Sequence, residues 1–301
     1  MRRRLGILGI AVLLTSIVLG GTFFASRQRQ ASVTDGTHRI FASRPAWSQD
    51  FSANPALDHS IWTPSTGVIN SDNNEQQYYT DQPENLRVEH GALRLIATNA
   101  TRSDGYRYQS ARIDTSGKKT ILYGRLDVVA QLPQGIGTWP ALWLLPASEE
   151  YANRSPMSDE SRYLNGGEID IMESIGSEPN TIYGTVHTTM DTALHTSPGQ
   201  YGTMVVGDSA SAFHTYTLLW TPTKLSYAID GHVFYSYSRM AGATYKTWPF
   251  DRPFYLIINL ALGGSWGGMN SAYPNGIDSS ALPASLDIRS VSYYPYVGRD
   301  H

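Results

Sequence analysis

Three carboxylates lie within six residues of the segment 166–173, which is otherwise apolar. Side chains of a strand alternate between its two faces, so Glu168 and Asp170 share one face and the intervening isoleucines occupy the other. Regular alternation would place Met172 beside these acids, and Glu173 joins them only if the strand contains a one-residue bulge. Bulges re-aim side chains and are common beside active sites. The spacing therefore predicts a bulged strand with three acids on one face.

We call Glu168, Asp170 and Glu173 the acid triad. Like charges on one face destabilise a strand, which favours a chemical role over a solvated edge strand. Glycoside hydrolysis requires two carboxyl groups that flank one bond, a nucleophile or base and a proton donor with a raised pKa. Glu168 and Glu173 could lean toward each other, with Asp170 sharing a proton with the nucleophile.

The distance between the two outer carboxyl groups would decide the stereochemistry of such a reaction. A separation of about 5–5.5 Å gives retention through a covalent intermediate, and acids on one strand favour this short separation. A Ca²⁺ site is the competing chemistry for the same oxygens. It is disfavoured because the residues around the triad lack the Asn, Asp and Gly spacing of a cation loop.

The triad lies in the sequence GEIDIME (167–173), which resembles the signature of glycoside hydrolase family 16. The resemblance is to the bulged form of this signature, which is typical of laminarinase-like endo-β-1,3-glucanases. Five further stretches resemble the family in the same order along the chain: 73–80, 123–125 with 139–146, 213–222 with 230–231, 253–264 and 286–291. The resemblance extends from about residue 47 to residue 294.

The resemblance implies a jelly roll whose concave sheet carries the substrate cleft. Glu168 would be the nucleophile, Glu173 the acid/base and Asp170 an assisting acid. The residues that the resemblance places at the sugar subsites are Asn74, Arg112, Trp139, Trp143, Tyr163, His187 and Trp266. The chain departs from the family pattern at Tyr163, where many relatives carry Trp, at Thr188–Met190, which replaces a frequent Gly, and at Gln49, where Asp is usual.

Other features of the sequence support a sugar-binding cleft. Trp266 lies in the glycine-rich loop 263–268, whose small neighbours leave it little to pack on, and this favours stacking on a sugar. Arg112 could bind sugar hydroxyls or pair with an acid, and we favour the sugar. The long irregular stretch 147–165 could form a rim of the cleft or a solvated insertion.

The histidines and the absence of cysteine bear on metal chemistry. His187 and His195 are eight residues apart, and no third ligand joins them, so a zinc site is not expected. His187 is expected to be a cleft residue that forms hydrogen bonds, and His214 to be buried with its partners. We expect no required cofactor; a structural Ca²⁺ ion could bind but is not indicated. The chain has no Cys, which excludes disulfides, thiolate metal sites and a thiol nucleophile.

The elements that must position the triad are predicted to be strands. Alternating segments flank two hairpin signals, His90-Gly91 and Asp230-Gly231. The segment 254–262 is almost continuously apolar, as a central buried strand would be. About ten to fourteen such segments and no long helical period predict an all-β fold of two packed antiparallel sheets, a sandwich or jelly roll.

Composition and the N-terminus bear on partners and location. A net charge of −3 with 16% charged residues leaves no polybasic surface for nucleic acid. Three arginines precede the uncharged run 5–24, which reads as a signal peptide or signal anchor, with a buried core helix as the alternative. The basic start would stay cytoplasmic and place the remainder outside. We expect residues 1–25 to be this segment, 26–45 a linker and 46–301 the catalytic domain.

The sequence thus predicts a secreted or membrane-tethered, monomeric enzyme that acts on extracellular β-glucan. The expected reaction is hydrolysis of internal β-1,3 bonds with retention. A family 16-like enzyme for mixed-linkage glucan or galactan, or a transglycosylase, is the alternative within the same class. A carbohydrate-binding jelly roll without turnover is the alternative outside it, although a pure binder needs no pair of Glu residues.

Overall fold

The computed structural model describes residues 40–69, 73–150, 165–189, 200–269 and 271–298. The chain divides into two compact units, Met1–Gln30 and Ala31–His301, and every described residue belongs to the second. The predicted segment 1–25, Tyr163 and His195 lie outside the described residues. No helix in the described part is long and apolar enough to cross a membrane.

The larger sheet contains eight strands among the described residues. Its strands are β1 (Trp47–Asp50), β4 (Leu86–Glu89), β5 (Ala92–Ala97), β8 (Gly124–Gln131), β13 (His214–Trp220), β14 (Lys224–Ile229), β15 (His232–Ser238) and β17 (Ala284–Pro295). They are arranged in the order β15-β14-β13-β8-β17-β5-β4, and β1 pairs with β17. All of these pairs are antiparallel.

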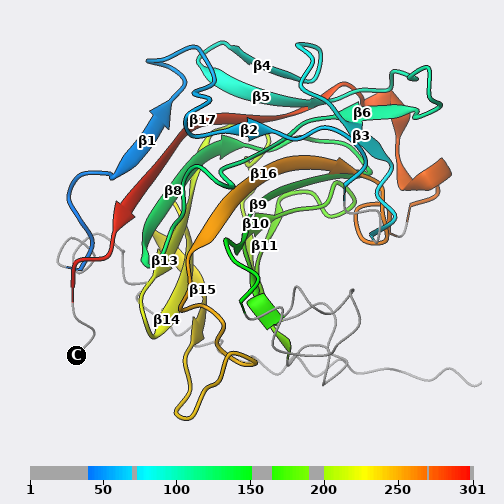
Figure 1. Ribbon diagram of the computed structural model, residues 1–301. Helices are drawn as coiled ribbons and strands as arrows, with labels where there is room; N and C mark the ends of the chain where they lie inside the picture. Colours follow the sequence, from blue (N-terminus) through cyan, green and yellow to red (C-terminus); the bar gives the residue numbers. More distant parts are fainter. Residues whose placement is uncertain (1–39, 70–72, 151–164, 190–199, 270, 299–301) are drawn as a thin grey trace, which may run out of the picture. The chain divides into compact units, whose positions relative to one another are not determined.

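The second sheet has seven described strands and carries the acid triad. Its strands are β2 (Thr63–Pro64), β7 (Arg112–Asp114), β9 (Thr138–Pro146), β10 (Glu168–Glu173), β11 (Thr181–His187), β12 (Gln200–Val205) and β16 (Phe254–Leu262). Their order is β12-β11-β10-β9-β16-β7-β2, again antiparallel throughout. Figure 1 shows β16, β9, β10 and β11 as neighbouring curved strands. A small parallel sheet pairs β3 (Gln77–Tyr79) with β6 (Tyr108–Ser110), and the 3₁₀ turns η4 (Pro274–Gly276) and η5 (Ser279–Ala281) precede β17.

One apolar core joins the two large sheets. Leu126 and Val128 of β8 and Leu142 and Leu144 of β9 are all 1% exposed or less and belong to the same buried cluster. These residues recur at every second position, so each strand directs one face to the core and the other away from it. The predicted all-β sandwich of antiparallel sheets is confirmed.

Two glycines allow the sheets to approach each other closely at one edge. Gly184 on β11 and Gly202 on β12 are paired. A Cβ at Gly202 would lie 2.6 Å from Cβ of Tyr235, and one at Gly184 would lie 2.9 Å from the ring of Phe234. Tyr235 and Phe234 belong to β15 of the other sheet. Any larger residue at either glycine would therefore push the layers apart.

Both predicted hairpins are present. His90 and Gly91 have φ of 53° and 75° between β4 and β5, and Asp230 and Gly231 have φ of 48° and 79° between β14 and β15. Two consecutive residues with positive φ are the geometry of the tight turns whose twist matches that of paired strands. β16 is also confirmed as a central buried strand, since it lies between β9 and β7.

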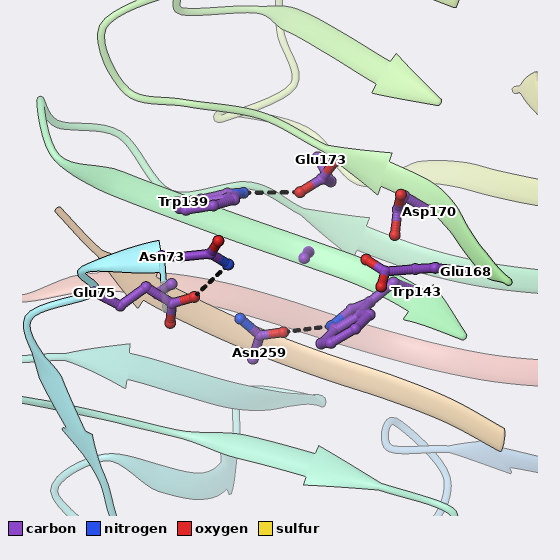
Figure 2. Close-up of a pocket in the computed structure, with 10 residues that line it drawn as sticks. Asn73, Glu75, Trp139, Trp143, Glu168, Asp170, Glu173 and Asn259 are labelled. Carbon is purple, nitrogen blue, oxygen red and sulfur yellow. Dashed lines mark hydrogen bonds between the residues drawn. The ribbon is translucent and has the colours of Figure 1, made fainter. Parts of the chain in front are cut away.

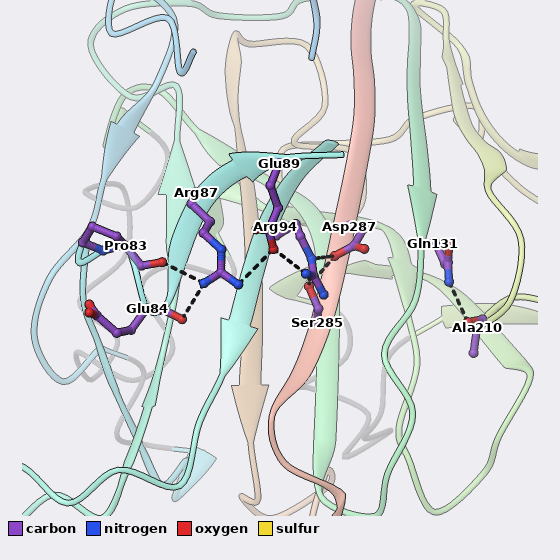
Figure 3. Close-up of polar contacts among 9 residues, drawn as sticks. All are labelled: Pro83, Glu84, Arg87, Glu89, Arg94, Gln131, Ala210, Ser285 and Asp287. Atoms are coloured by element: carbon purple, nitrogen blue, oxygen red, sulfur yellow. Dashed lines mark hydrogen bonds and ion pairs between the residues drawn. The ribbon is translucent and has the colours of Figure 1, made fainter. Parts of the chain in front are cut away.

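Figure 3 shows a set of ion pairs that links β4, β5 and β17 on the larger sheet. Arg94 lies 2.5 Å from Glu89 and 3.0 Å from Asp287, and Arg87 lies 2.9 Å from Glu89. Ser285 also donates to Asp287. These side chains are partly exposed, so each pair contributes modestly to stability.

Some details of the fold differ from the sequence prediction. The described residues form more strands than the ten to fourteen expected, because β2, β3, β6 and β7 have only two or three residues and show no periodicity. The parallel pair β3–β6 was not predicted. Residues 26–45 were predicted to be a linker, but Phe41 is buried and forms a β-bridge with Tyr296. The last residues of this range, from 40 onward, therefore pack against the chain that follows β17.

Candidate active site

β10 contains the predicted bulge. Between Asp170 and Glu173 the chain advances three residues while its partner β11 advances two, and the pairing with β9 also shifts there. Ile171 and Met172 are consecutive, yet both are buried in the core. The extra core-facing residue returns Glu173 to the face that carries Glu168 and Asp170. The structure thus places the whole acid triad on one face, as the spacing predicted.

The triad lies in an open pocket on the face of the sheet that points away from the core. About 330 Å³ of space, part of it open to solvent, lies between its walls. Its walls are formed by Asn73, Glu75, Trp139, Ala141, Trp143, Glu168, Asp170, Glu173, Asn259 and Ala261. Figure 2 shows the acids along β10 and the turn with Asn73 and Glu75 on another wall. The curved sheet therefore carries a cleft in which the three acids face other polar groups.

The acid triad is electrostatically strained. Asp170 is 2% exposed, and Glu168 and Glu173 are partly buried. Burial, followed by the charge of Asp170, raises the pKa of Glu168 well above its usual range. Burial and the charge of Glu173 also raise the pKa of Asp170 well above its usual range, although its side-chain hydrogen bond with Glu168 acts in the opposite direction. Three neighbouring carboxylates in such a site cannot all ionise, so the triad retains protons that a reaction can use.

Glu173 has a different environment at the other end of the bulge. Burial raises its pKa, while the hydrogen bond from Trp139 and the nearby His187 lower it. The indole Nε1 of Trp139 donates to Oε1 of Glu173 at 2.9 Å, which fixes the direction of that carboxyl group (Figure 2). The bond from Trp139 therefore orients Glu173 apart from the Glu168–Asp170 pair, while its charge still acts on the protons of that pair.

His187 lies beside the triad, at the Glu168 end of β10. It pairs with Glu168 in the β10–β11 register, and its Nε2 lies 3.2 Å from Oδ2 of Asp170. One ligand atom from each of Glu168, Asp170 and His187 lies within 4.8 Å of the others. These are ligand types that divalent metals accept. A cation at this place would compete with the proton shared by the two carboxylates.

Glu75 forms a second acidic wall that sequence reasoning did not select. Gln77 donates to its Oε2 at 2.6 Å, and Asn73 approaches Oε1 at 3.4 Å. Burial raises the pKa of Glu75, although these donors and Arg112 oppose the shift. The carboxyl group is thus held in the pocket by fixed donors, where it can accept hydrogen bonds from a polar ligand.

A chain of hydrogen bonds orients Trp143 in the pocket. Its Nε1 donates to Oδ1 of Asn259 at 2.6 Å, and Nδ2 of Asn259 donates to the hydroxyl of Tyr79 at 3.1 Å. Arg112 is only 7% exposed, lies 5.2 Å from the Trp143 ring centroid, and does not line the pocket. Its Nε and Nη1 have no protein partner among the described residues. The predicted contact of Arg112 with sugar stays a prediction.

Asn74 and Trp266 lie near the pocket but not in its lining. Asn74 is exposed and donates to Ser265 at 2.9 Å, which ties its turn to the glycine-rich loop. Trp266 is half-buried and packs edge-on against Trp139 at 5.3 Å and Tyr183 at 5.1 Å. The glycines beside Trp266 had suggested that this side chain has little to pack on. In the structure it packs on two aromatic rings from other segments of the chain.

Sequence reasoning missed Asn73, Glu75 and Asn259 in the pocket. A signal for Asn259 existed, because it is the polar residue within the apolar run of β16. Asn73 and Glu75 stand in the stretch 73–80 that supported the family resemblance. By contrast, His214 was predicted correctly: it is 9% exposed, with Nδ1 2.7 Å from Asp230 and Nε2 3.2 Å from Asp208.

Known proteins match this chain over most of its length. The model of the family Glycosyl hydrolases family 16 matches residues 72–278. A beta-glucanase from Rhodothermus marinus is 37% identical over 257 residues, which cover 83% of this chain and 85% of the relative. Glucan endo-1,3-beta-glucosidase A1 from Niallia circulans is 34% identical over 268 residues, which cover 82% of this chain and 37% of that relative.

A solved structure agrees with these sequence matches. The X-ray structure of the laminarinase from Rhodothermus marinus superposes with a TM-score of 0.77 at 35% identity, and the match covers 86% of this chain and 100% of that one. The sandwich fold and the bulged strand with three acids also agree with what the signature at residues 167–173 implied. This chain therefore belongs to glycosyl hydrolases family 16 and is a glycoside hydrolase.

Proposed function

We propose that this glycoside hydrolase cleaves internal β-1,3-glucosidic bonds of laminarin-type β-glucans and retains the anomeric configuration. The observation that carries the proposal is the acid triad on one bulged strand, with Glu173 held by Trp139 apart from the Glu168–Asp170 pair. The names of the relatives support the choice of glucan, since they include a beta-glucanase and a glucan endo-1,3-beta-glucosidase.

The proposed mechanism is a double displacement. The proton that Glu168 and Asp170 share passes to Asp170, so that Glu168 attacks the anomeric carbon as a carboxylate and forms a glycosyl ester while Glu173 gives its own proton to the departing glycosidic oxygen. Glu173, now a carboxylate, takes a proton from water, and the hydroxyl attacks the ester and releases Glu168. Asp170 hydrogen-bonds to Glu168 and keeps a proton available as the charge on the nucleophile changes.

We also propose that the enzyme needs no cofactor, is a monomer and acts outside the cell. The acids supply both the nucleophile and the proton donor, so the reaction requires no cofactor. We propose a monomer that reaches the outside of the cell through segment 1–25, either released or tethered by it, with residues 26–45 as linker. Size-exclusion chromatography with light scattering tests the monomer. Fractionation of expressing cells tests the location, which a cytoplasmic majority would contradict.

The test of the activity uses the full chain on laminarin, mixed-linkage β-glucan, agarose, carrageenan and xyloglucan, with release of reducing ends as readout. Glu168→Gln and Glu173→Gln should each lose at least about a thousandfold in kcat, because each removes a reacting group. Asp104→Asn is the matched control, since Asp104 is an exposed acid paired with Arg102 outside the pocket. Near-normal turnover by Glu168→Gln would refute the assignment.

Product analysis tests the stereochemistry and the alternatives. Proton NMR of fresh products should show the β-anomer first, and azide with Glu168→Ala should yield a glycosyl azide of inverted configuration. Activity on mixed-linkage glucan or galactan alone would keep the mechanism and overturn the substrate. Longer products from added sugar acceptors would indicate a transglycosylase. Binding without turnover on any polymer would support the carbohydrate-binding alternative.

A further inference from the structure

Four aromatic rings form a continuous row beside the pocket. Trp139 contacts Trp266 with ring centroids 5.3 Å apart, Trp266 contacts Tyr183 at 5.1 Å, and Tyr183 contacts Tyr201 at 5.9 Å. We call these four residues the aromatic row. Trp139 lines the pocket and bonds Glu173, so the row begins at the acid triad and ends on β12.

The strand registers place both tyrosines on the same face as the triad. Tyr183 is directly opposite Glu173, and Tyr201 is opposite Thr185, which is itself opposite Asp170. Residues directly opposite in antiparallel strands project to the same face. Gly202, the next residue on β12, faces Tyr235 of the other sheet, which confirms that Tyr201 points away from the core.

Tyr201 is a large ring that the described fold leaves uncovered. It is 47% exposed, whereas Tyr183 is partly buried and its hydroxyl donates to Glu178. β12 lies two strands from β10, or about 10 Å at the usual spacing. A rigid aromatic surface at that distance can stack on a pyranose ring of a polymer whose cleaved bond lies at the triad.

The row extends to the opposite side of β10 from the polar walls of the pocket. Asn259 and Ala261 belong to β16 and Trp143 to β9, on one side of β10, while Tyr183 and Tyr201 belong to β11 and β12 on the other. The row also starts at Glu173, the proposed proton donor to the departing oxygen. These two facts place Tyr183 and Tyr201, the far end of the row, on the side of the sugars that leave.

We propose that Tyr201, supported by Tyr183, forms a binding site for the part of the glucan chain that departs after cleavage. The site takes a pyranose ring at least one unit beyond the first departing sugar and gives the enzyme its preference for long chains. This inference rests on the proposed glucanase function, because it uses the roles of the triad to assign the direction of the chain.

The experiment compares two substrates in the full-length enzyme. Laminarihexaose can place several sugars on the departing side, whereas a 4-nitrophenyl laminaribioside places only one aromatic group there. Tyr201→Ala should lower kcat/KM on the hexaose about tenfold, mainly through KM, and by less than about twofold on the aryl substrate. In laminarihexaose labelled with ¹⁸O at its reducing end, the label marks the departing fragment. The labelled fragments that Tyr201→Ala releases should be shorter than those of wild type.

Two further variants provide matched controls. Tyr201→Trp keeps a ring at the site and should restore hexaose kinetics, which separates stacking from a general disturbance of β12. Tyr106→Ala removes a tyrosine that is 38% exposed and precedes β6, outside the row, and it should leave both substrates unaffected. Unfolding midpoints within error of wild type show that the variants are folded.

The outcomes distinguish failure of this inference from failure of the proposed function. An active enzyme whose Tyr201→Ala variant matches wild type on hexaose overturns the departing-side site alone. Equal losses on both substrates overturn the assignment to the departing side. A wild-type enzyme that cleaves neither glucan substrate overturns the proposed function, and with it the site as stated. A selective loss on hexaose that Tyr201→Trp restores supports the site.

Discussion

The bond from Trp139 to Glu173 should set the upper pH limit of activity. Trp139→Phe keeps an aromatic ring in the pocket and removes the Nε1 donor, which lies 2.9 Å from Oε1 of Glu173. A hydrogen bond to a charged group contributes roughly 1.5–3 kcal/mol, and water that replaces the indole would restore part of this. Since 1.36 kcal/mol corresponds to one pKa unit, the pKa of Glu173 should rise by about one unit.

The sign of the shift in activity follows from the role proposed for Glu173 as proton donor. It must be protonated when it protonates the departing oxygen, so kcat/KM falls as pH rises through its apparent pKa in the free enzyme. The lost donor stabilised the carboxylate, so Glu173 in the variant keeps its proton to higher pH. The falling limb of kcat/KM against pH should therefore move about one unit toward alkaline pH.

The assay is the pH dependence of kcat/KM on a soluble laminari-oligosaccharide, measured at low substrate concentration. Trp143→Phe is the matched control, because Trp143 lines the same pocket but donates to the neutral amide of Asn259. Its KM should change while its falling limb stays at the wild-type pH. A Trp139→Phe limb that does not move, or that moves to lower pH, would refute this account of Glu173.

Three further predictions concern metal, packing and pH. Dialysis against EDTA should leave kcat unchanged; loss of activity that Ca²⁺ or Zn²⁺ restores would contradict a metal-free reaction. Gly202→Ala should lower the free energy of unfolding, measured with denaturant, by about 1–3 kcal/mol, because the new Cβ would lie 2.6 Å from Cβ of Tyr235. Gly207→Ala is the neutral control, because a Cβ at Gly207 would have no atom within 4 Å. Arg87 and Arg94 lower the pKa of Glu89 from 4.5 to about 2. Ionised Glu89 therefore stabilises the fold above pH 4.5, and this stabilisation is lost as the pH falls through 2. The melting temperatures of wild type and Glu89→Gln should thus differ above pH 5 and converge near pH 2; a constant difference would contradict this.

The sequence was most informative where structure depends on neighbouring residues. The alternation of acids and isoleucines in 168–173 required a bulge, and β10 has it between Asp170 and Glu173. The turns at His90-Gly91 and Asp230-Gly231 were also readable, because positive φ at two consecutive positions favours these residue types. In each case, the backbone preference and the face of each side chain are set within a few residues.

The sequence alone did not determine which distant residues meet the triad. Glu75 and Asn259 reach the pocket from segments far from β10 in the chain. Asn259 arrives because β16 pairs with β9, and Glu75 arrives because it bridges Gly263 just after β16. The burial of Arg112 beside Trp143 was likewise not readable from the sequence, and its predicted contact with sugar stays a prediction. Tyr201 joins the aromatic row only because β12 pairs with β11.

The sequence by itself thus determined that three acids share one face of a bulged strand, and it determined the class of fold, because strand alternation and turn chemistry are local properties. Only the tertiary structure decided the hydrogen bond from Trp139 to Glu173, the second acidic wall at Glu75 and the aromatic row that ends at Tyr201. The physical reason is that strand pairing over long sequence distances is selected by burial of the whole core, which no short segment encodes.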